Sequence, residues 1–255
     1  MSGSMKHGMS RRMAVCGFLS CLGFWIVARS ERGHAVVSYV WGRLRGGFSI
    51  QERVRMHGAD VEKRLKPKFL AAGVSFPPSE LAWIAFKDSA QLCVYARSNA
   101  SGSWRWIHTY PILGMSGTTG PKLRQGDRQV PEGMYRAESL NPNSRFHLSI
   151  RLNYPNEFDR IQAKADGRTD LGSDIMIHGT TASVGCLAMG NQAAEDLFVL
   201  AAHTGKDKVE ILVSPVDFRV QDLKPPLGSP SWINDLYGQL RTNLDRFPGT
   251  VVHVP

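Results

Sequence analysis

Residues 174–191 carry the side chains with the most evident chemistry in this chain. They read DIMIHGTTASVGCLAMGN, in which an apolar run leads to His178 and Gly179, and Cys186 follows eight positions after the histidine. A free thiol has a pKa near about 8.5, and a nearby imidazole favours the thiolate that attacks a carbonyl carbon. A histidine and a cysteine this close in sequence can meet across a tight loop. We therefore predict acyl transfer with Cys186 as the nucleophile and His178 as its base.

The turn before the cysteine contains Ser183 and Gly185. Because glycine lets the backbone turn sharply, the amides of Gly185 and Cys186 can point at one spot and bind a developing oxyanion. A structural interpretation is also open, in which His178 ends a buried strand and Cys186 packs in a core. Spacing alone does not decide between the two. The glycine directly after the histidine and the polar turn around the cysteine favour catalysis.

Metal and cofactor chemistry finds little support in the same segment. No second cysteine or histidine stands at metal-ligand spacing from His178 or Cys186, so we predict neither a metal nor a cofactor. Cys93 lies in the apolar run at residues 92–96, where a lone cysteine is typical of a buried core, and we assign it no chemistry.

The segment resembles the signature of the L,D-transpeptidase catalytic domain family, also called the YkuD domain, which joins a His-Gly pair to a Ser-x-Gly-Cys end. Here these are His178-Gly179 and Ser183-Val184-Gly185-Cys186. Further motifs are similar to the YafK-like branch: GPKLRQGDRQVPEGMY at 120–135, NPNSRFHLSI at 141–150 and NYPNEFDR at 153–160. The resemblance covers residues 60–220.

This resemblance implies an enzyme that acts on peptidoglycan stem peptides through a thioester. Cys186 attacks the carbonyl of an L-to-D peptide bond, His178 serves as base and later as acid, and a carbonyl of the His178-Gly179 turn orients the imidazole. The amides near Gly185 bind the oxyanion, and Ser183 supports the turn. An amine acceptor makes the enzyme a transpeptidase, whereas water makes it a hydrolase that releases cross-links or a peptidoglycan-linked lipoprotein. A catalytically inactive wall-binding module is a third possibility, against which the intact Cys and His argue.

One position departs from the family pattern. Many relatives follow the catalytic cysteine with an apolar residue and an arginine, but this chain has Leu187 and Ala188. We predict that Arg145 or His147 replaces the missing arginine as a substrate-binding residue, although either could be an ordinary solvated residue.

The rest of the chain predicts the elements that position these residues. Strand-like apolar runs occupy residues 81–86, 91–97, 104–113, 134–137, 146–152, 174–178 and 209–213. Helical spacing predicts helices over 51–73, 192–203 and around residues 232–244, and residues 114–133 form a glycine-rich loop. Loops of this length in compact domains are usually functional.

Pattern and resemblance together indicate an α+β fold that is mainly β, a mixed-sheet sandwich or barrel of the YkuD type with flanking helices. We predict a signal peptide or membrane anchor with a linker at 1–50, a lead-in helix at 51–80, the catalytic domain at 81–220 and a helical extension at 221–255.

Net charge is uneven along the chain. Of the formal +9, the first 50 residues contribute +6 from seven basic residues and one acidic residue, which leaves +3 for the remaining 205. Arg11 and Arg12 precede sixteen uncharged residues at 13–28, an order typical of an export signal. We therefore predict export to the periplasm or cell envelope, with residues 13–28 either cleaved after Ala28 or retained as an inner-membrane anchor. The body has no basic stripe with interleaved aromatics, so we predict no nucleic-acid partner.

Overall fold

The computed structural model describes residues 46–249, and residues from Ser49 onward belong to one compact unit. The predicted signal or anchor at residues 13–28 lies outside this range. Among residues 46–249, no helix is both long and apolar enough to cross a membrane.

Within the described residues, eight strands form one mixed sheet in the order β3-β2-β1-β8-β4-β5-β6-β7. The strands are β1 (Glu80–Phe86), β2 (Gln91–Arg97), β3 (Arg105–Pro111), β4 (Gly133–Asn141), β5 (Ser149–Leu152), β6 (Met176–His178), β7 (Leu187–Ala188) and β8 (Val209–Ser214). Parallel pairing joins β1 to β8 and β6 to β7, whereas the other neighbouring strands are antiparallel. The predicted mixed sheet is therefore confirmed.

The apolar runs in β1 and β2 are continuous because both faces of these strands are buried. Side chains alternate along a strand, so one set of residues faces each way. Leu81, Trp83 and Ala85 join a core that includes residues of α3 and α5, and Ala82, Ile84 and Phe86 join a second core with residues of α6.

The sheet changes course at β4. The first part of this strand, Gly133 to Arg136, pairs with β8, and its second part, Ala137 to Asn141, pairs with β5. A register irregularity between Ala137 and Ser139 accompanies the change of partner. Such an irregularity bends a strand, so β4 joins the β1–β2–β3–β8 part of the sheet to the part that carries the predicted site.

The lead-in helix is α3 (Ile50–Ala71). It begins with a capping box in which Ser49 accepts a hydrogen bond from the backbone of Glu52, whose carboxylate accepts one from the backbone of Ser49. Its buried residues Val61, Leu65 and Phe69 recur every four positions and form the stripe that packs into the first core.

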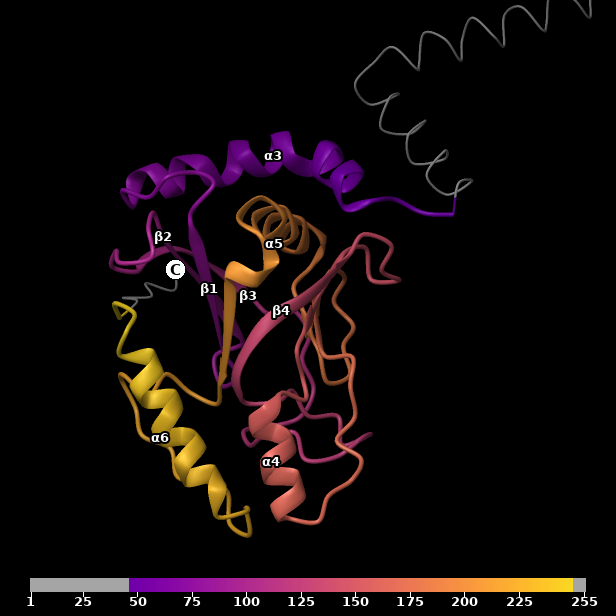
Figure 1. Cartoon of the computed structure of the whole chain (residues 1–255), viewed down its shortest axis with the longest axis vertical. Helices are drawn as coiled ribbons and strands as arrows, with labels where there is room; N and C mark the ends of the chain where they lie inside the picture. Colours follow the sequence, from indigo (N-terminus) through magenta and orange to yellow (C-terminus); the bar gives the residue numbers. More distant parts are fainter. Residues whose placement is uncertain (1–45, 250–255) are drawn as a thin grey trace, which may run out of the picture. The chain divides into compact units, whose positions relative to one another are not determined.

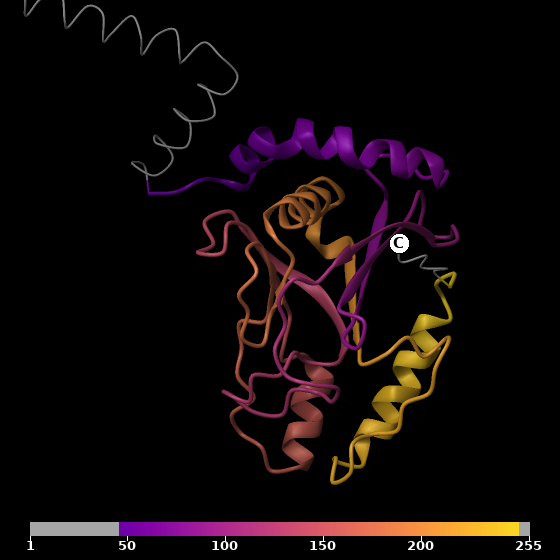
Figure 2. The same cartoon turned by 180° about the vertical axis from the view of Figure 1, so that it is seen from behind.

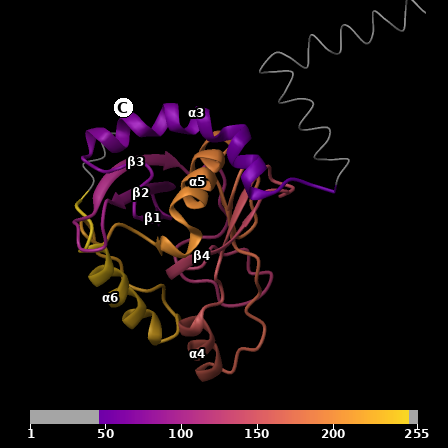
Figure 3. The ribbon, with the colours of Figure 1, turned by 45° about the horizontal axis from the view of Figure 1, so that its top comes forward.

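Two further helices cover the sheet where the sequence predicts them. Helix α5 (Asn191–Thr204) packs against α3, and Figures 1 and 3 show it between α3 and the strands. Helix α6 (Trp232–Leu244) buries Ile233, Leu236 and Leu240 against the opposite face of β1 and β2. In Figures 1 and 2 it lies on the far side of the strands from α3.

Helix α4 (Glu157–Ala165) is an element that the sequence analysis does not predict. It has nine residues, shorter than the stretch of about 11–18 residues over which helical periodicity is normally judged. The sequence feature that could have predicted this helix is its capping box, in which Asn156 and Asp159 exchange side-chain and backbone hydrogen bonds.

Asp159 should make the stability of the protein depend on pH. Burial raises the pKa of this carboxyl to about 6, against hydrogen bonds from Asn156 and Tyr135 that act in the opposite direction. The folded state therefore favours the protonated form, and this contribution to stability is lost as pH rises through about 6. Asp159→Asn stays neutral, so its Tm relative to the wild type should increase between pH 4 and pH 8.

Thermal unfolding of both proteins across this interval measures the effect. Glu157→Gln, which removes an exposed carboxylate from the same helical turn, is the control. A Tm difference between Asp159→Asn and wild type that stays constant with pH would contradict the assignment.

Candidate active site

His178 is held by hydrogen bonds on both sides of its strand. It ends β6, where it is registered with Ser149 of β5, and the next amide, of Gly179, donates to the carbonyl of Leu148. On the other side, the amide of Met189 donates to the carbonyl of His178 at 2.8 Å. The backbone under the imidazole is thus fixed by two neighbouring segments.

The imidazole of His178 has one defined tautomer. Its Nδ1 lies 2.6 Å from the carbonyl oxygen of Gly179. A carbonyl oxygen can only accept, so Nδ1 must donate and Nε2 carries the free lone pair of the neutral ring. This is the carbonyl contact that the family resemblance implies, and it leaves Nε2 as the basic atom.

The turn that carries Cys186 is closed by two serine hydroxyls. Ser183 Oγ accepts from the amide of Cys186 at 3.0 Å and donates to the carbonyl of the same residue at 2.7 Å. The amide of Gly185, whose φ of +82° suits glycine, donates to Ser116 Oγ at 2.7 Å. In this structure the amides of Gly185 and Cys186 are both paired with hydroxyls, and their binding of an oxyanion stays a prediction.

Cys186 directly precedes the strand that pairs with the strand of His178. In the parallel pair β6–β7, His178 is registered with Ala188, and Cys186 stands two positions before Ala188, just outside β7. The pairing of β6 with β7 thus brings the chain at Cys186 beside the strand that ends at His178. Among the described residues, the thiol contacts the carbonyl of Asp174 at 3.5 Å and makes no hydrogen bond to His178.

Both reactive groups are neutral at rest. Burial raises the pKa of the Cys186 thiol above its usual range, and burial lowers the pKa of His178 below its usual 6.5. The amide of Met176 and the carbonyl of Gly179 act in the opposite direction without overcoming burial. The site therefore holds a thiol and a neutral imidazole rather than a thiolate and an imidazolium.

Phe146 forms one wall of the site. Its ring is stacked on the imidazole of His178 with centroids 4.5 Å apart and an interplanar angle of 31°. A Cβ on Gly179 would lie 2.6 Å from the carbonyl oxygen of Phe146 and 2.8 Å from Oδ1 of Asn191. Only glycine fits between these atoms, which explains the His-Gly pair physically.

A buried ion pair shapes the glycine-rich loop at residues 114–133. Lys87 Nζ lies 3.0 Å from Glu132 Oε1 and donates to the carbonyls of Gly120 and Val130. Glu132 also accepts from the amide of Gly120 at 2.6 Å. Lys87, which directly follows β1, and Glu132 therefore hold the loop at two places, Gly120 and Val130.

Asp127 closes the central part of this loop. Its carboxylate pairs with Lys122 at 2.6 Å and accepts from the backbone amides of Leu123, Arg124 and Gln129. These bonds give the loop a fixed shape despite its lack of regular structure.

The two predicted substrate-binding residues are placed differently. Arg145 is exposed beside Phe146 and has no ion-pair partner among the described residues. His147 instead directs Nε2 at Glu195 Oε1, 2.8 Å away on α5, and its ring lies against that of His57. Of the two, Arg145 is the exposed side chain, and its binding of a substrate carboxylate stays a prediction.

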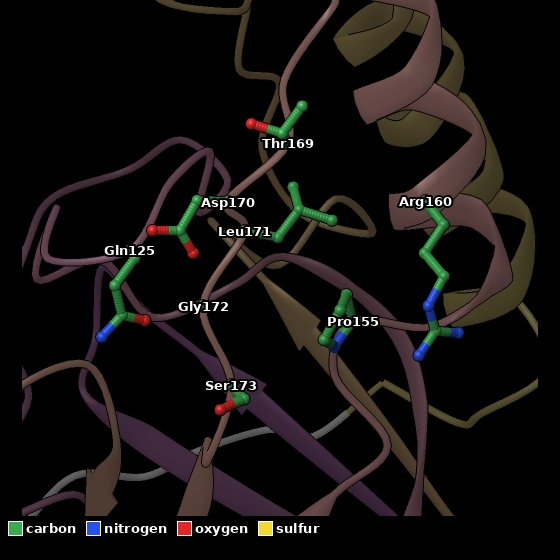
Figure 4. A pocket seen from close by; sticks show the side chains of 8 residues that line it. All are labelled: Gln125, Pro155, Arg160, Thr169, Asp170, Leu171, Gly172 and Ser173. Carbon is green, nitrogen blue, oxygen red and sulfur yellow. The ribbon is translucent and has the colours of Figure 1, made fainter.

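A second unpaired cation lines a cavity of about 590 Å³ between α4 and residues 169–173. Figure 4 shows the guanidinium of Arg160 and the carboxylate of Asp170 on opposite sides of this cavity. Its lining ends at Ser173, next to Asp174, whose carbonyl contacts the Cys186 thiol. The cavity thus adjoins the segment that leads into the site.

Ser116, Phe146 and the carbonyl of Asp174 are parts of the site that the sequence analysis does not single out. Ser116 lies in the glycine-rich loop and Phe146 lies between the two predicted binding residues, so the correct segments are indicated without the correct atoms. No spacing rule connects Ser116 to Gly185, which lies 69 positions later.

Gly179→Ala should destabilise the fold, because the new Cβ would collide with backbone and with Asn191. Overpacking of this kind costs typically about 1–3 kcal/mol. The matched control is Gly58→Ala in α3, where the nearest atom to a new Cβ is Val54 Cγ1 at 3.8 Å. Replacing a helical glycine there should stabilise the protein by about 0.5–1 kcal/mol.

Urea denaturation gives the free energy of unfolding for both variants. Equal stability of Gly179→Ala and wild type would show that the backbone around Phe146 yields without cost.

The sequence of this chain is similar to two curated proteins. It is 32% identical over 170 residues to YafK of Escherichia coli (strain K12), a protein assigned provisionally as an L,D-transpeptidase, and the same figures hold for YafK of Escherichia coli O157:H7. The aligned region covers 65% of this chain and 65% of the relative. The chain thus spans about two thirds of the length of these curated relatives.

Solved structures give weaker likenesses. The helical cell shape determining protein Pgp2 from Campylobacter jejuni has a TM-score of 0.43 and 23% identity, over 54% of this chain and 48% of that one. L,D-transpeptidase 1 from Mycobacterium tuberculosis has a TM-score of 0.31 and 15% identity, over 53% and 62%. Both scores are low, and we base no conclusion on them.

The model of the L,D-transpeptidase catalytic domain, YkuD, matches residues 84–251. This match contains the whole His178–Cys186 segment and continues through α6, past the boundary predicted at residue 220. The chain therefore belongs to the YkuD family of L,D-transpeptidase catalytic domains.

Proposed function

We propose that this protein is an L,D-transpeptidase that acts on peptidoglycan stem peptides through a thioester at Cys186. One observation carries the proposal: the hydrogen bond from His178 Nδ1 to the Gly179 carbonyl leaves Nε2 as the base, at the end of the strand that pairs with the segment directly after Cys186. Family membership supports the class of reaction. No metal is needed to form the nucleophile in this scheme.

Acylation begins when the thiol turns from the Asp174 carbonyl toward His178. Nε2 of His178 takes the thiol proton while Sγ of Cys186 attacks the carbonyl carbon of the scissile L-to-D peptide bond. The tetrahedral intermediate then collapses, and the imidazolium gives its proton to the leaving amine. The thioester and a neutral imidazole remain.

Stabilisation of the oxyanion requires an exchange of hydrogen-bond partners. The amides of Gly185 and Cys186 donate to Ser116 and Ser183 at rest. An oxyanion is a stronger acceptor than a hydroxyl, so the developing charge takes over one or both amides. The two serines thus hold the donors in position until substrate arrives.

Deacylation decides between transfer and hydrolysis. An acceptor amine, or water, gives its proton to His178 Nε2 and attacks the thioester carbon, after which the sulfur leaves as thiolate and regains a proton. Water as acceptor would make the protein a hydrolase of the same bond, able to release cross-links or a peptidoglycan-linked lipoprotein. We favour transfer to an amine and keep hydrolysis as the alternative.

We also propose that the protein is exported and works in the cell envelope, in the periplasm or attached to the inner membrane through residues 13–28. The basic residues followed by sixteen uncharged positions support export, and the proposed substrate lies in the same compartment.

The mechanism predicts that Cys186→Ala abolishes acylation and turnover, and that Cys186→Ser is nearly inactive because a hydroxyl is much harder to deprotonate. Mass spectrometry can follow both the adduct with a carbapenem-type acylating agent and the muropeptide products. Cys93→Ala is the control, because Cys93 is buried in the second core, and it should leave the adduct on Cys186. Muropeptide turnover by pure Cys186→Ala protein would refute the mechanism, and an adduct without turnover would point to a wall-binding module.

The pH profile tests the role of His178. Because its pKa is lowered, the imidazole stays able to accept a proton below pH 6.5, and acylation should fall only at lower pH. His178→Ala should retain slow acylation that increases toward alkaline pH, since hydroxide then forms the thiolate of a cysteine whose pKa is raised. Identical profiles for this variant and wild type would exclude His178 as the base.

Arg145 should bind a substrate carboxylate in place of the arginine that is absent after Cys186. A charge-assisted hydrogen bond is worth about 1.5–3 kcal/mol, so Arg145→Ala should lower kcat/KM by roughly 10- to 100-fold. Arg160→Ala tests a second arginine, which lines the neighbouring cavity. The control is Arg105→Ala on β3, at the opposite edge of the sheet from β7. Wild-type kcat/KM in both Arg145→Ala and Arg160→Ala would show that other groups hold the carboxylate.

A further inference from the structure

Two histidines and a glutamate from three separate elements meet outside the Cys186 turn. His57 comes from α3, His147 from the loop between β4 and β5, and Glu195 from α5. One ligand atom from each of the three lies within 4.8 Å of the others. Glu195 Oε1 lies 2.8 Å from His147 Nε2 and 3.5 Å from His57 Nδ1.

These distances suit a small divalent cation. Zn²⁺ binds imidazole nitrogen and carboxylate oxygen at about 2.0–2.2 Å, so two ligands at a tetrahedral angle are about 3.4 Å apart. The cluster needs only small side-chain shifts to reach that spacing. Each side chain keeps between 16% and 23% of its surface exposed, which leaves access for a cation and for a water as the fourth ligand.

The contacts of His57 in this structure leave its two ring nitrogens without ordinary hydrogen bonds. Its Nδ1 lies 3.5 Å from Glu195 Oε1, longer than an ordinary hydrogen bond, and its Nε2 is buried without a partner among the described residues. Nδ1, which faces Glu195 Oε1, is the atom that a cation held between the two residues would use.

The neighbouring Arg64 does not bind the Glu195 oxygen that faces the two histidines. Arg64 binds Asp196 at 2.7 Å and lies 3.8 Å from Oε2 of Glu195. Oε1 of Glu195 faces both imidazoles instead. His147 is also held at a φ of +74°, a conformation that persists in a non-glycine residue only where surrounding contacts impose it.

We propose that His57, His147 and Glu195 form a binding site for one divalent transition-metal cation of the Zn²⁺ type, completed by water. The sequence predicts no metal here because the ligands are far apart in the chain and become neighbours only when α3 packs against α5. This site is independent of the proposed acyl-transfer chemistry.

Such a cation would clamp three elements around the wall of the candidate active site. It would join α3 to α5 and fix the loop of His147, whose neighbour Phe146 stacks on His178. Cross-linking segments that are distant in sequence stabilises the folded state, because the unfolded chain cannot present all three ligands together.

The test measures Zn²⁺ binding by the full chain after chelator treatment, using isothermal titration calorimetry and elemental analysis. His57→Ala and Glu195→Gln should each lose one equivalent of bound Zn²⁺ relative to wild type, together with the Zn²⁺-dependent increase in Tm. His203→Gln, which removes an exposed histidine from the same helix as Glu195, should bind as the wild type does. Cobalt substitution should give the absorption of a tetrahedral site in wild type but not in the two variants.

The comparison of variants excludes binding elsewhere in the chain, because other ligands contribute equally to every protein. Equal Zn²⁺ stoichiometry and equal Tm increases in wild type, His57→Ala and Glu195→Gln would overturn the proposal. Circular dichroism of the chelated proteins confirms folding, and Glu195→Gln, which keeps an oxygen acceptor for His147, remains decisive if His57→Ala unfolds.

Discussion

The buried ion pair between Lys87 and Glu132 is the contact on which the candidate site depends most. Their side chains are 2% and 0% exposed, and removing one partner of such a pair costs about 3–5 kcal/mol because the other charge is left buried. The pair fixes Gly120 and Val130, and Tyr237 of α6 donates to the same carboxylate. It thus links β1, the glycine-rich loop and α6. That loop brings Ser116 to the amide of Gly185, so the position of the cysteine turn depends on charges outside it.

Much of the fold could be predicted because its signals are local. The runs in β1 and β2 are apolar at consecutive positions, and α3 repeats apolar residues every four, so element type follows from periodicity. Helix α4 has nine residues and β7 only two, so both are too short for periodicity to indicate them. The predicted strand at 146–152 starts too early, since His147 has a positive φ and regular pairing begins at Ser149.

The candidate site was only partly predictable for a different reason. His178, Gly179 and Cys186 are close in sequence, and their residue types indicate the chemistry directly. Two of their contacts come from distant parts of the sequence: the ring of Phe146 lies over the imidazole, and the Ser116 hydroxyl accepts from the Gly185 amide. The predicted oxyanion donors illustrate the limit. A glycine before a cysteine indicates that amides can converge, but it does not indicate that the hydroxyls of Ser116 and Ser183 accept from them in the structure.

Burial of both reactive groups determines the resting state of the pair. Because burial raises the pKa of Cys186 and lowers that of His178, the pair gains charge only as the thiol proton moves, when substrate is already in place. A thiolate held permanently at rest would be open to oxidation in an envelope compartment, whereas a buried thiol is protected. In the proposed enzyme the same burial keeps the pair uncharged until substrate binds, and an amine or water can then resolve the thioester.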